Sequence, residues 1–346
     1  MRRRGNLIFD YLLKATNSKV DVSGTEVYGW FKMGVNTATI APNVRNNSTN
    51  PNRVQTAQDC KSAGAAALLV SGKIINPDHY AGFIAIVNVP VDAGAAGQAI
   101  VANQNEPVSF YAHEMLHVYG LDHSFVMAKD LSANHVWEFG TDTPYNDCWD
   151  IMSYATCTYR FNTPNHGLHG PELQLAYRQK LGWLPAGSVF VKDQADRSLS
   201  TVTLSPVSEP TGPGPLMAVV ELTSGAKYVV EYRIKQGFDQ GIPNNAVVIR
   251  ELRSNGNTYL VKRQNQSIGW AQGEQFTDTG NFLSITVNET KPLSAKITIN
   301  PVLSIGVQMG EICGNKFVGQ IHQCPTNSVC DSRRTPPLVS IDYFCQ

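Results

Sequence analysis

The chain has 346 residues, of which 42% are apolar, and its 28 Lys and Arg residues balance 28 Asp and Glu residues. Such a chain has no net field to attract nucleic acid or an anionic membrane. No apolar run approaches the ~18 residues of a membrane-spanning helix. Because the length exceeds one typical domain, we expect a globular protein of more than one domain.

The chain begins with a basic cluster, Arg2 to Arg4, but the apolar segment behind it carries Asp10 and makes a poor signal-peptide core. No signal peptide is visible in it. Residues 19 to 40 contain alternating, β-branched runs around a glycine, a pattern that predicts strands at the opening of the first domain.

An α-helix followed by a sheet is predicted next. Ala-rich spacing from Val54 to Leu69 is typical of a helix that packs closely on a sheet. The apolar run from Phe83 to Val89 predicts a central buried strand. The Gly- and Ala-rich segment from Val91 to Gly97 is expected to form an edge near the site described next, where an extended ligand could add as another strand.

The stretch from His113 to His123 reads His-Glu-Met-Leu-His-Val-Tyr-Gly-Leu-Asp-His. On a helix that begins near Pro107, His113 and His117 share one face and can hold one Zn²⁺ ion. Gly120 allows a tight turn that brings His123 back as the third ligand, which leaves the fourth position for water. Glu114 is predicted to be the general base that acts on this water.

A second motif follows about 30 residues later. Cys148-Trp149-Asp150-Ile151-Met152-Ser153-Tyr154 comes after an irregular segment that contains Asp142, Asn146 and Asp147. The side chains of Asp142, Asn146, Asp147 and Asp150 could bind Ca²⁺, although acidic loops are more often simply solvated.

Together, the histidine motif and the Asp-Ile-Met-Ser-Tyr segment resemble the metzincin zinc peptidases. The resemblance implies that Met152 lies in a turn beneath the three histidines and that Tyr154 helps to stabilise the oxyanion. The finer similarity is to the gametolysin-like and immune-inhibitor-A-like branches. It rests on the following pieces: Val27 to Trp30, His123 to Phe125, Leu181 to Leu184 and Tyr228 to Arg233.

Cys148 and Cys157 bracket the Met152 turn, and we predict that a disulfide between them holds it in place. The apolar positions from Leu173 to Leu181 then predict a helix that ends at Gly182 and closes the first domain.

From Val189 the pattern changes to short alternating runs punctuated by Gly, Pro and Asn, which is typical of an antiparallel β-sandwich. The runs are Leu199 to Leu204, Leu216 to Leu222, Tyr228 to Ile234, Ala246 to Leu252, Asn281 to Val287 and Ala295 to Ile299. The predicted fold class is therefore α+β, with a metzincin-type domain at residues 1–187, a sandwich at 188–305 and a cystine-rich tail at 306–346.

The tail contains Cys313, Cys324, Cys330 and Cys345, for which three disulfide pairings are possible. A second zinc site is the alternative, but no Cys-x-x-Cys pair is present. Cysteine usage and the sequons at Asn46, Asn47, Asn265 and Asn288 favour an oxidising, extracellular location. We therefore expect the chain to begin inside a longer precursor, or its start to be misassigned, with the partner of Cys60 in the absent part.

The complete motif predicts a secreted zinc endopeptidase that acts on proteins or peptides. Two alternatives stay open: a metzincin-fold binding or adhesion protein with little or no turnover, and a zinc hydrolase that acts on bonds other than peptides. The sequence does not predict the side-chain specificity, the oligomeric state or the mode of activation.

Overall fold

The computed structural model describes residues 2–22, 24–34, 51–75, 80–88, 91, 93–127, 146–153, 158–164, 167–261, 263 and 269–301. It also describes the short strands at 129–130, 135–136, 143–144, 312–314, 321–323, 330–331 and 344–345. The chain forms two compact units, Met1–Pro301 and Val302–Gln346. In the described residues, no helix is long and apolar enough to cross a membrane.

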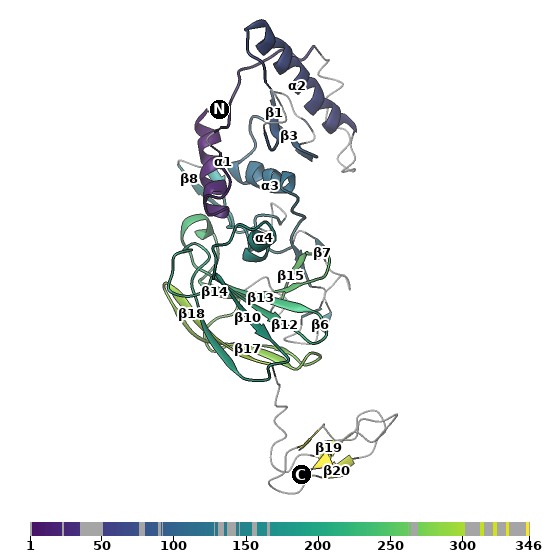
Figure 1. Cartoon of the computed structure of the whole chain (residues 1–346), viewed down its shortest axis with the longest axis vertical. Coiled ribbons are helices and arrows are strands. Elements are labelled where there is room, and N and C mark those ends of the chain that lie inside the picture. Colours follow the sequence, from purple (N-terminus) through teal and green to yellow (C-terminus); the bar gives the residue numbers. More distant parts are fainter. Residues whose placement is uncertain are drawn as a thin grey trace. The chain divides into compact units, whose positions relative to one another are not determined.

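The N-terminal part of the first unit is a small sheet with helices on both faces (Figure 1). The sheet has the order β1-β3-β2, in which β1 and β3 are parallel and β2 is antiparallel to β3. Its elements are α1 (Arg2–Ala15), α2 (Pro51–Val70), β1 (Phe83–Val87), β2 (Gly94–Ala96), β3 (Ala99–Asn103) and α3 (Val108–Val118).

Alternation of side chains across the sheet explains how the helices cover it. On one face, Ala57 of α2 packs against Ala99 and Val101. On the other face, Ala102 packs with Ile8 of α1 and with residues of α3. The helix predicted from Val54 to Leu69 is confirmed. Of its predicted apolar face Ala57 is buried against the sheet, whereas Val54, Ala66 and Leu69 are exposed.

Two expectations for this region are wrong. Residues 19–22 and 24–34 form neither helix nor strand, because none of the described strands pairs with them. Their side chains stay partly or fully exposed, so an alternating pattern gains nothing from burial. The run beginning at Phe83 does form β1, but as an edge strand of intermediate burial. The central strand is β3, whose shorter Ala-Ile-Val-Ala sequence is buried from Ala99 to Ala102.

The unit also contains a two-stranded sheet, β8 (Phe161–Thr163) and β9 (Gly167–His169), and helix α4 (Leu175–Lys180). The helix predicted from Leu173 to Leu181 is confirmed. It ends before Gly182, which has a φ of 70° and allows the chain to turn away.

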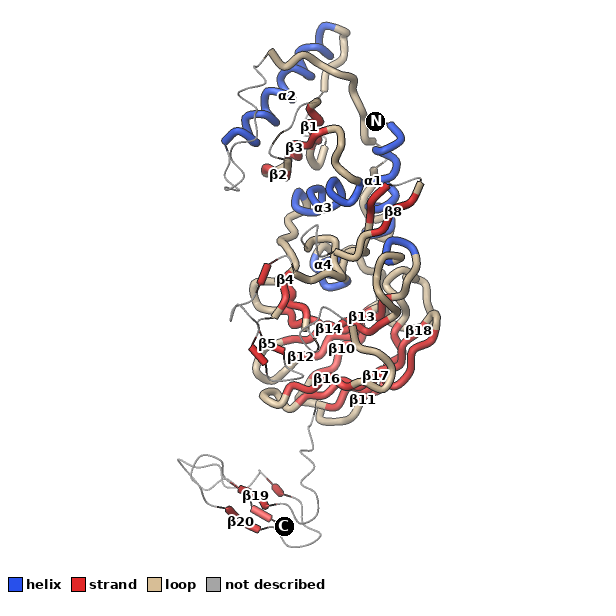
Figure 2. The backbone as a smooth tube through the Cα atoms, turned by 180° about the vertical axis from the view of Figure 1, so that it is seen from behind, coloured by secondary structure: helices blue, strands red, loops and turns tan. Residues whose placement is uncertain are grey.

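A seven-stranded mixed sheet and a four-stranded antiparallel sheet complete the unit (Figure 2). The first has the order β10-β12-β13-β14-β15-β4-β7 and the second β11-β18-β17-β16. The strands of the larger sheet are β4 (Phe125–Val126), β7 (Thr143–Pro144), β10 (Val189–Asp193), β12 (Met217–Glu221), β13 (Lys227–Arg233), β14 (Ala246–Leu252) and β15 (Thr258–Leu260). Those of the smaller sheet are β11 (Ser200–Leu204), β16 (Gln275–Asp278), β17 (Leu283–Lys291) and β18 (Ser294–Asn300).

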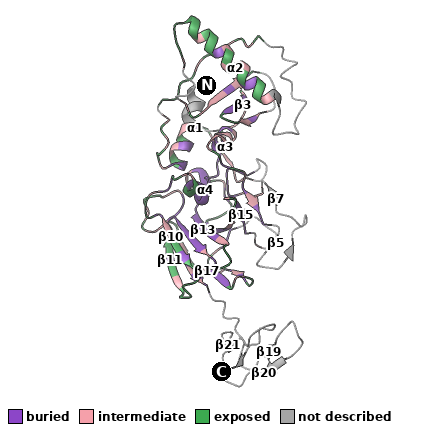
Figure 3. Ribbon diagram, turned by 45° about the vertical axis from the view of Figure 1, so that its right-hand side comes forward, coloured by how far each residue is buried: buried purple, intermediate pink, exposed green. Residues whose placement is uncertain are grey.

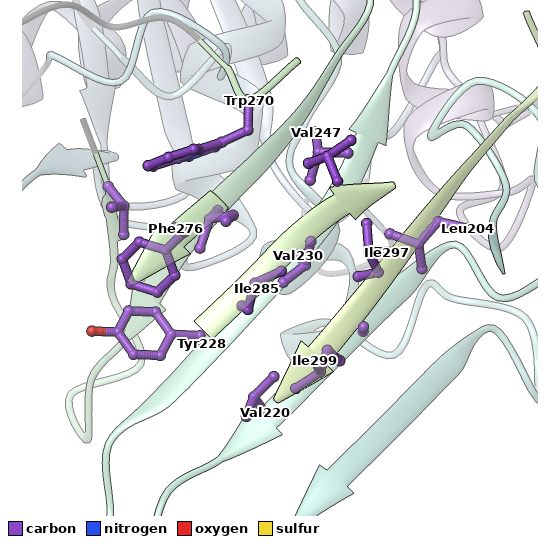
Figure 4. Packing of buried hydrophobic residues seen from close by; sticks show 14 of the residues in the cluster. Leu204, Val220, Tyr228, Val230, Val247, Trp270, Phe276, Ile285, Ile297 and Ile299 are labelled. Atoms are coloured by element: carbon purple, nitrogen blue, oxygen red, sulfur yellow. The ribbon is translucent and has the colours of Figure 1, made fainter. Parts of the chain in front are cut away.

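Side chains from the two sheets form one buried core (Figure 4). Val220 and Val230 of the larger sheet pack with Ile285 and Ile297 of the smaller one, and none of the four is exposed to solvent. The sandwich and its six predicted segments are therefore confirmed. The sandwich is not purely antiparallel, because β10 runs parallel to β12 and β15 parallel to β4.

The predicted boundary between residues 187 and 188 stays a prediction. Strand β4, which begins two residues after His123, joins the sheet built by β10 to β15. The short pair β5 (Lys129–Asp130) and β6 (His135–Val136) and the 3₁₀ turn η3 (Gly237–Asp239) complete the described elements of this unit.

The second unit contains two short antiparallel pairs, β19 (Ile312–Gly314) with β20 (Ile321–Gln323) and β21 (Cys330–Asp331) with β22 (Phe344–Cys345). In the backbone register, Cys330 lies opposite Cys345. Cys324 lies outside the described residues, and the tail disulfides stay a prediction.

Candidate metal centre

Helix α3 presents two different faces. Pro107 stands at its N-cap, and the side buried in the protein is lined by Val108, Tyr111, Ala112 and Leu116. His113 and His117 lie one turn apart on another side. The helix ends at Val118, with Tyr119 as its C-cap. Gly120, with a φ of 84°, lets the backbone N–H of Leu121 donate to the carbonyl of Leu116 at 3.2 Å. This turn returns the chain toward the two histidines.

The predicted triad is assembled. The Nε2 atom of His117 lies 3.0 Å from Nε2 of His113 and 3.0 Å from Nε2 of His123. Within the described residues, these three side chains form the one group of His, Cys, Asp or Glu that could hold a metal ion.

The tautomers of two of these imidazoles follow from their second hydrogen bond. Nδ1 of His113 lies 2.7 Å from the carbonyl oxygen of Ile151, and Nδ1 of His117 lies 2.8 Å from that of Leu121. A carbonyl oxygen only accepts, so each Nδ1 carries the proton and each Nε2 is left with a lone pair.

This arrangement fits a zinc ion. Two lone pairs 3.0 Å apart repel each other, and a cation between the nitrogens removes that repulsion. Ligands at about 2.0–2.1 Å from a tetrahedral Zn²⁺ ion lie about 3.3 Å from one another, which is close to the nitrogen separations here. Hydrogen bonds from the remote ring nitrogens to carbonyl oxygens are also typical of zinc-binding histidines.

Burial keeps the imidazoles neutral. Desolvation and the neighbouring His117 lower the pKa of His113 to about 3. Desolvation, again followed by the effect of His117, lowers the pKa of His123 to about 4. Both rings are therefore neutral in neutral solution, the charge state in which histidine binds a metal.

Glu114 follows His113 on the helix and is held by the sheet. Its Oε2 accepts a hydrogen bond from the backbone N–H of Ala95 in β2 at 2.7 Å. Desolvation raises the pKa of the Glu114 carboxyl above its usual value, a shift in the direction that suits a general base. The expectation that residues 91 to 97 form an edge near the site is confirmed by β2.

Met152 is fully buried and packs in the cluster that contains Leu116 and Leu121 around α3. Its turn is tied to both ends of the histidine motif. Ile151 accepts the hydrogen bond of His113, and the carbonyl of Met152 accepts one from the backbone N–H of Ser124 at 3.1 Å. Met152 thus lies in a buried turn whose neighbour Ile151 contacts His113, and its place beneath all three histidines stays a prediction.

The same turn is anchored by two buried aspartates. Asp150 accepts hydrogen bonds from the backbone N–H and the side-chain amide of Gln174, at 3.2 and 2.6 Å. Desolvation and the nearby Asp147 raise the pKa of Asp150 to about 6. Asp147 pairs with Arg250 of β14 at 2.5 Å. Both aspartates are thus engaged by protein groups, and the calcium hypothesis draws no support from them.

Arg250 belongs to a buried ion network that the sequence analysis missed. Glu231 of β13 accepts hydrogen bonds from Arg233 at 2.8 Å and from Arg250 at 2.6 Å, and Asp239 binds Arg233. None of these side chains is more than 1% exposed. Charged residues inside the apolar strand runs Tyr-Val-Val-Glu-Tyr-Arg and Val-Val-Ile-Arg were the signal that could have revealed it.

The structure describes only some of the remaining predicted site residues. Tyr154, Cys157 and Asp142 lie outside the described residues, so the oxyanion role of Tyr154 stays a prediction. Cys148 is half-buried and disulfide-bonded. Its pairing with Cys157 remains a prediction as well. Cys60 of α2 is a free thiol that packs against the sheet.

None of the family models, curated proteins and solved structures compared with the chain matches it.

Proposed function

We propose that the protein is a secreted zinc-dependent endopeptidase of the metzincin type. The observation that supports this proposal is the convergence of the Nε2 atoms of His113, His117 and His123. Glu114 follows His113 on the same helix, and Met152 lies in the turn whose Ile151 carbonyl contacts His113. Zn²⁺ bound at His113, His117 and His123 would supply Lewis-acid chemistry at a peptide carbonyl.

The side chains of this chain then have distinct roles. Glu114 takes a proton from the attacking water and gives it to the leaving amine, because its carboxylate stands next to the ligands without being one. Ala95 holds this carboxylate through its backbone N–H. Tyr154 is assigned a share of the oxyanion charge by the resemblance alone.

Substitution of Glu114 by Gln tests the assignment. The variant keeps the three nitrogen ligands, so zinc content measured by mass spectrometry is expected to stay at one ion per chain. Peptide hydrolysis is expected to fall at least about 100-fold, the usual scale of a general base. As a matched control, His117→Ala loses both zinc and hydrolysis. Robust proteolysis by the Glu114→Gln variant would refute the role of Glu114.

A digest of a mixed peptide library, read by mass spectrometry with and without a chelator, separates the three hypotheses. Chelator-sensitive cleavage of peptides supports the endopeptidase and reports its side-chain preference. Zinc binding without cleavage supports a binding or adhesion protein. Turnover confined to ester or acyl-amide substrates supports a different hydrolase.

A further inference from the structure

The third histidine is held differently from the other two. His113 and His117 are fixed by helix α3, whereas His123 follows the Gly120 turn and lies on no helix or strand. Its backbone N–H donates to the side chain of Asp122 at 2.8 Å. Its carbonyl oxygen accepts a hydrogen bond from the hydroxyl of Tyr177 at 2.7 Å. The position of this ligand therefore depends on a residue 54 positions further along the chain.

Tyr177 lies on helix α4 and is completely buried. Its ring packs in the cluster that contains Met152 and Leu121. A carbonyl oxygen only accepts hydrogen bonds, so the Tyr177 hydroxyl is the donor in its bond to His123. The hydroxyl hence makes a rigid link between α4 and the loop that carries His123.

Helix α4 has only six residues and is fixed by buried carboxylates at its first turn. Glu231 of the sandwich accepts a hydrogen bond from the backbone N–H of Leu175 at 2.9 Å. Asp150, next to the Met152 turn, accepts the backbone N–H of Gln174. Unsatisfied N–H groups at a helix start favour negative charge. The two carboxylates therefore determine where Tyr177 stands.

We propose that Tyr177 is a positioning residue for the third metal ligand and that the sandwich, through Glu231 and α4, sets the place of His123. The inference rests on the proposed zinc site. Without the hydroxyl, the carbonyl of His123 loses its partner, and the loop beyond Gly120 moves relative to His113 and His117. The expected result is a looser third ligand at a site that still has all three imidazoles.

The test compares Tyr177→Phe with Tyr232→Phe in the full chain. Tyr232 is a matched control, because it is also fully buried and its hydroxyl also donates to a backbone carbonyl, that of Lys291, at 2.7 Å. Tyr232 is part of β13 and Lys291 is part of β17, and neither strand carries a proposed metal ligand. Zinc affinity is measured by competition with a chromophoric chelator, and ligand geometry by the visible absorption spectrum of the Co²⁺-loaded proteins.

Tyr177→Phe is expected to weaken zinc binding about tenfold, the lower end of the effect of groups that orient metal ligands, and to change the Co²⁺ spectrum. Tyr232→Phe is expected to bind zinc as the wild type does. Wild-type affinity and spectrum in Tyr177→Phe would overturn the inference alone. Equal weakening in both variants would also overturn it, since the cause would be general loosening. A wild-type chain without zinc affinity would overturn the proposed function together with the inference.

Discussion

Replacement of Glu231 by Gln measures what the buried ion network contributes to stability. Burial by itself would raise the pKa of this carboxyl, but Arg250 and Arg233 lower it from 4.5 to about 2. A displacement of this size corresponds to about 3 kcal/mol of stability at pH 7. Removal of one partner from a buried ion pair typically costs about 3–5 kcal/mol. The estimate from the pKa shift therefore agrees with the usual cost of breaking such a pair.

The sign of the pH dependence follows from the lowered pKa. The contribution of Glu231 is fully present above the unfolded-state pKa near 4.5, and it is lost as the pH falls toward the folded-state value of about 2. The stability difference between wild type and Glu231→Gln is therefore expected to be about 3 kcal/mol at pH 7 and about half of that or less at pH 3.

Urea unfolding of both proteins at pH 7, 5 and 3, followed by tryptophan fluorescence, provides the assay. Glu221→Gln is the control, because that carboxylate is 41% exposed and pairs with Lys227 at the surface. It is expected to change stability by less than about 1 kcal/mol. A Glu231→Gln effect no larger than the control, or one that stays constant between pH 5 and pH 3, would refute the reasoning.

Two further outcomes follow from the metal centre. Removal of zinc by a chelator should lower the Tm of the wild type. Zinc at about 100 times its Kd stabilises the folded chain by about 2.7 kcal/mol. A Tm that changes neither with the chelator nor with added zinc would contradict the proposed metal site. Reduction of the disulfide at Cys148, beside the Met152 turn, should lower peptide hydrolysis before it unfolds the chain. Full activity after replacement of both Cys148 and Cys157 by Ser would count against that role.

The histidine triad was predictable because its geometry is local. Four residues along a helix place His113 and His117 on one face, and the glycine turn returns His123 within six residues of His117. The six sandwich segments were predictable for a similar reason, since alternation within each strand reflects the burial of one face. In both cases the residues that form the structure are close together in the sequence, so a short stretch of sequence is enough to predict it.

The partners of the site were not predictable from local patterns. Tyr177 looks like an ordinary buried aromatic residue, and its hydrogen bond to His123 exists because α4 and the Gly120 turn meet in space. Asp147 appeared to be a solvated or calcium-binding residue, although Arg250 neutralises it in the interior. Alternation in residues 19–22 and 24–34 was misleading, because none of the strands that the structure describes pairs with them. Such pairings depend on topology, which strand and helix patterns do not contain.

Figure 3 shows that burial continues from α4 into β13 and the neighbouring strands of the sandwich. Backbone hydrogen bonds also join the histidine motif to the sandwich. Strand β4 begins two residues after His123 and pairs with β15 on one side and β7 on the other. A gene break near codon 187 would leave unpaired edges on both products. Residues Met1–Pro301 form one compact unit, and a fragment cut at residue 187 is therefore expected to lose strand pairing on the side that carries the histidines.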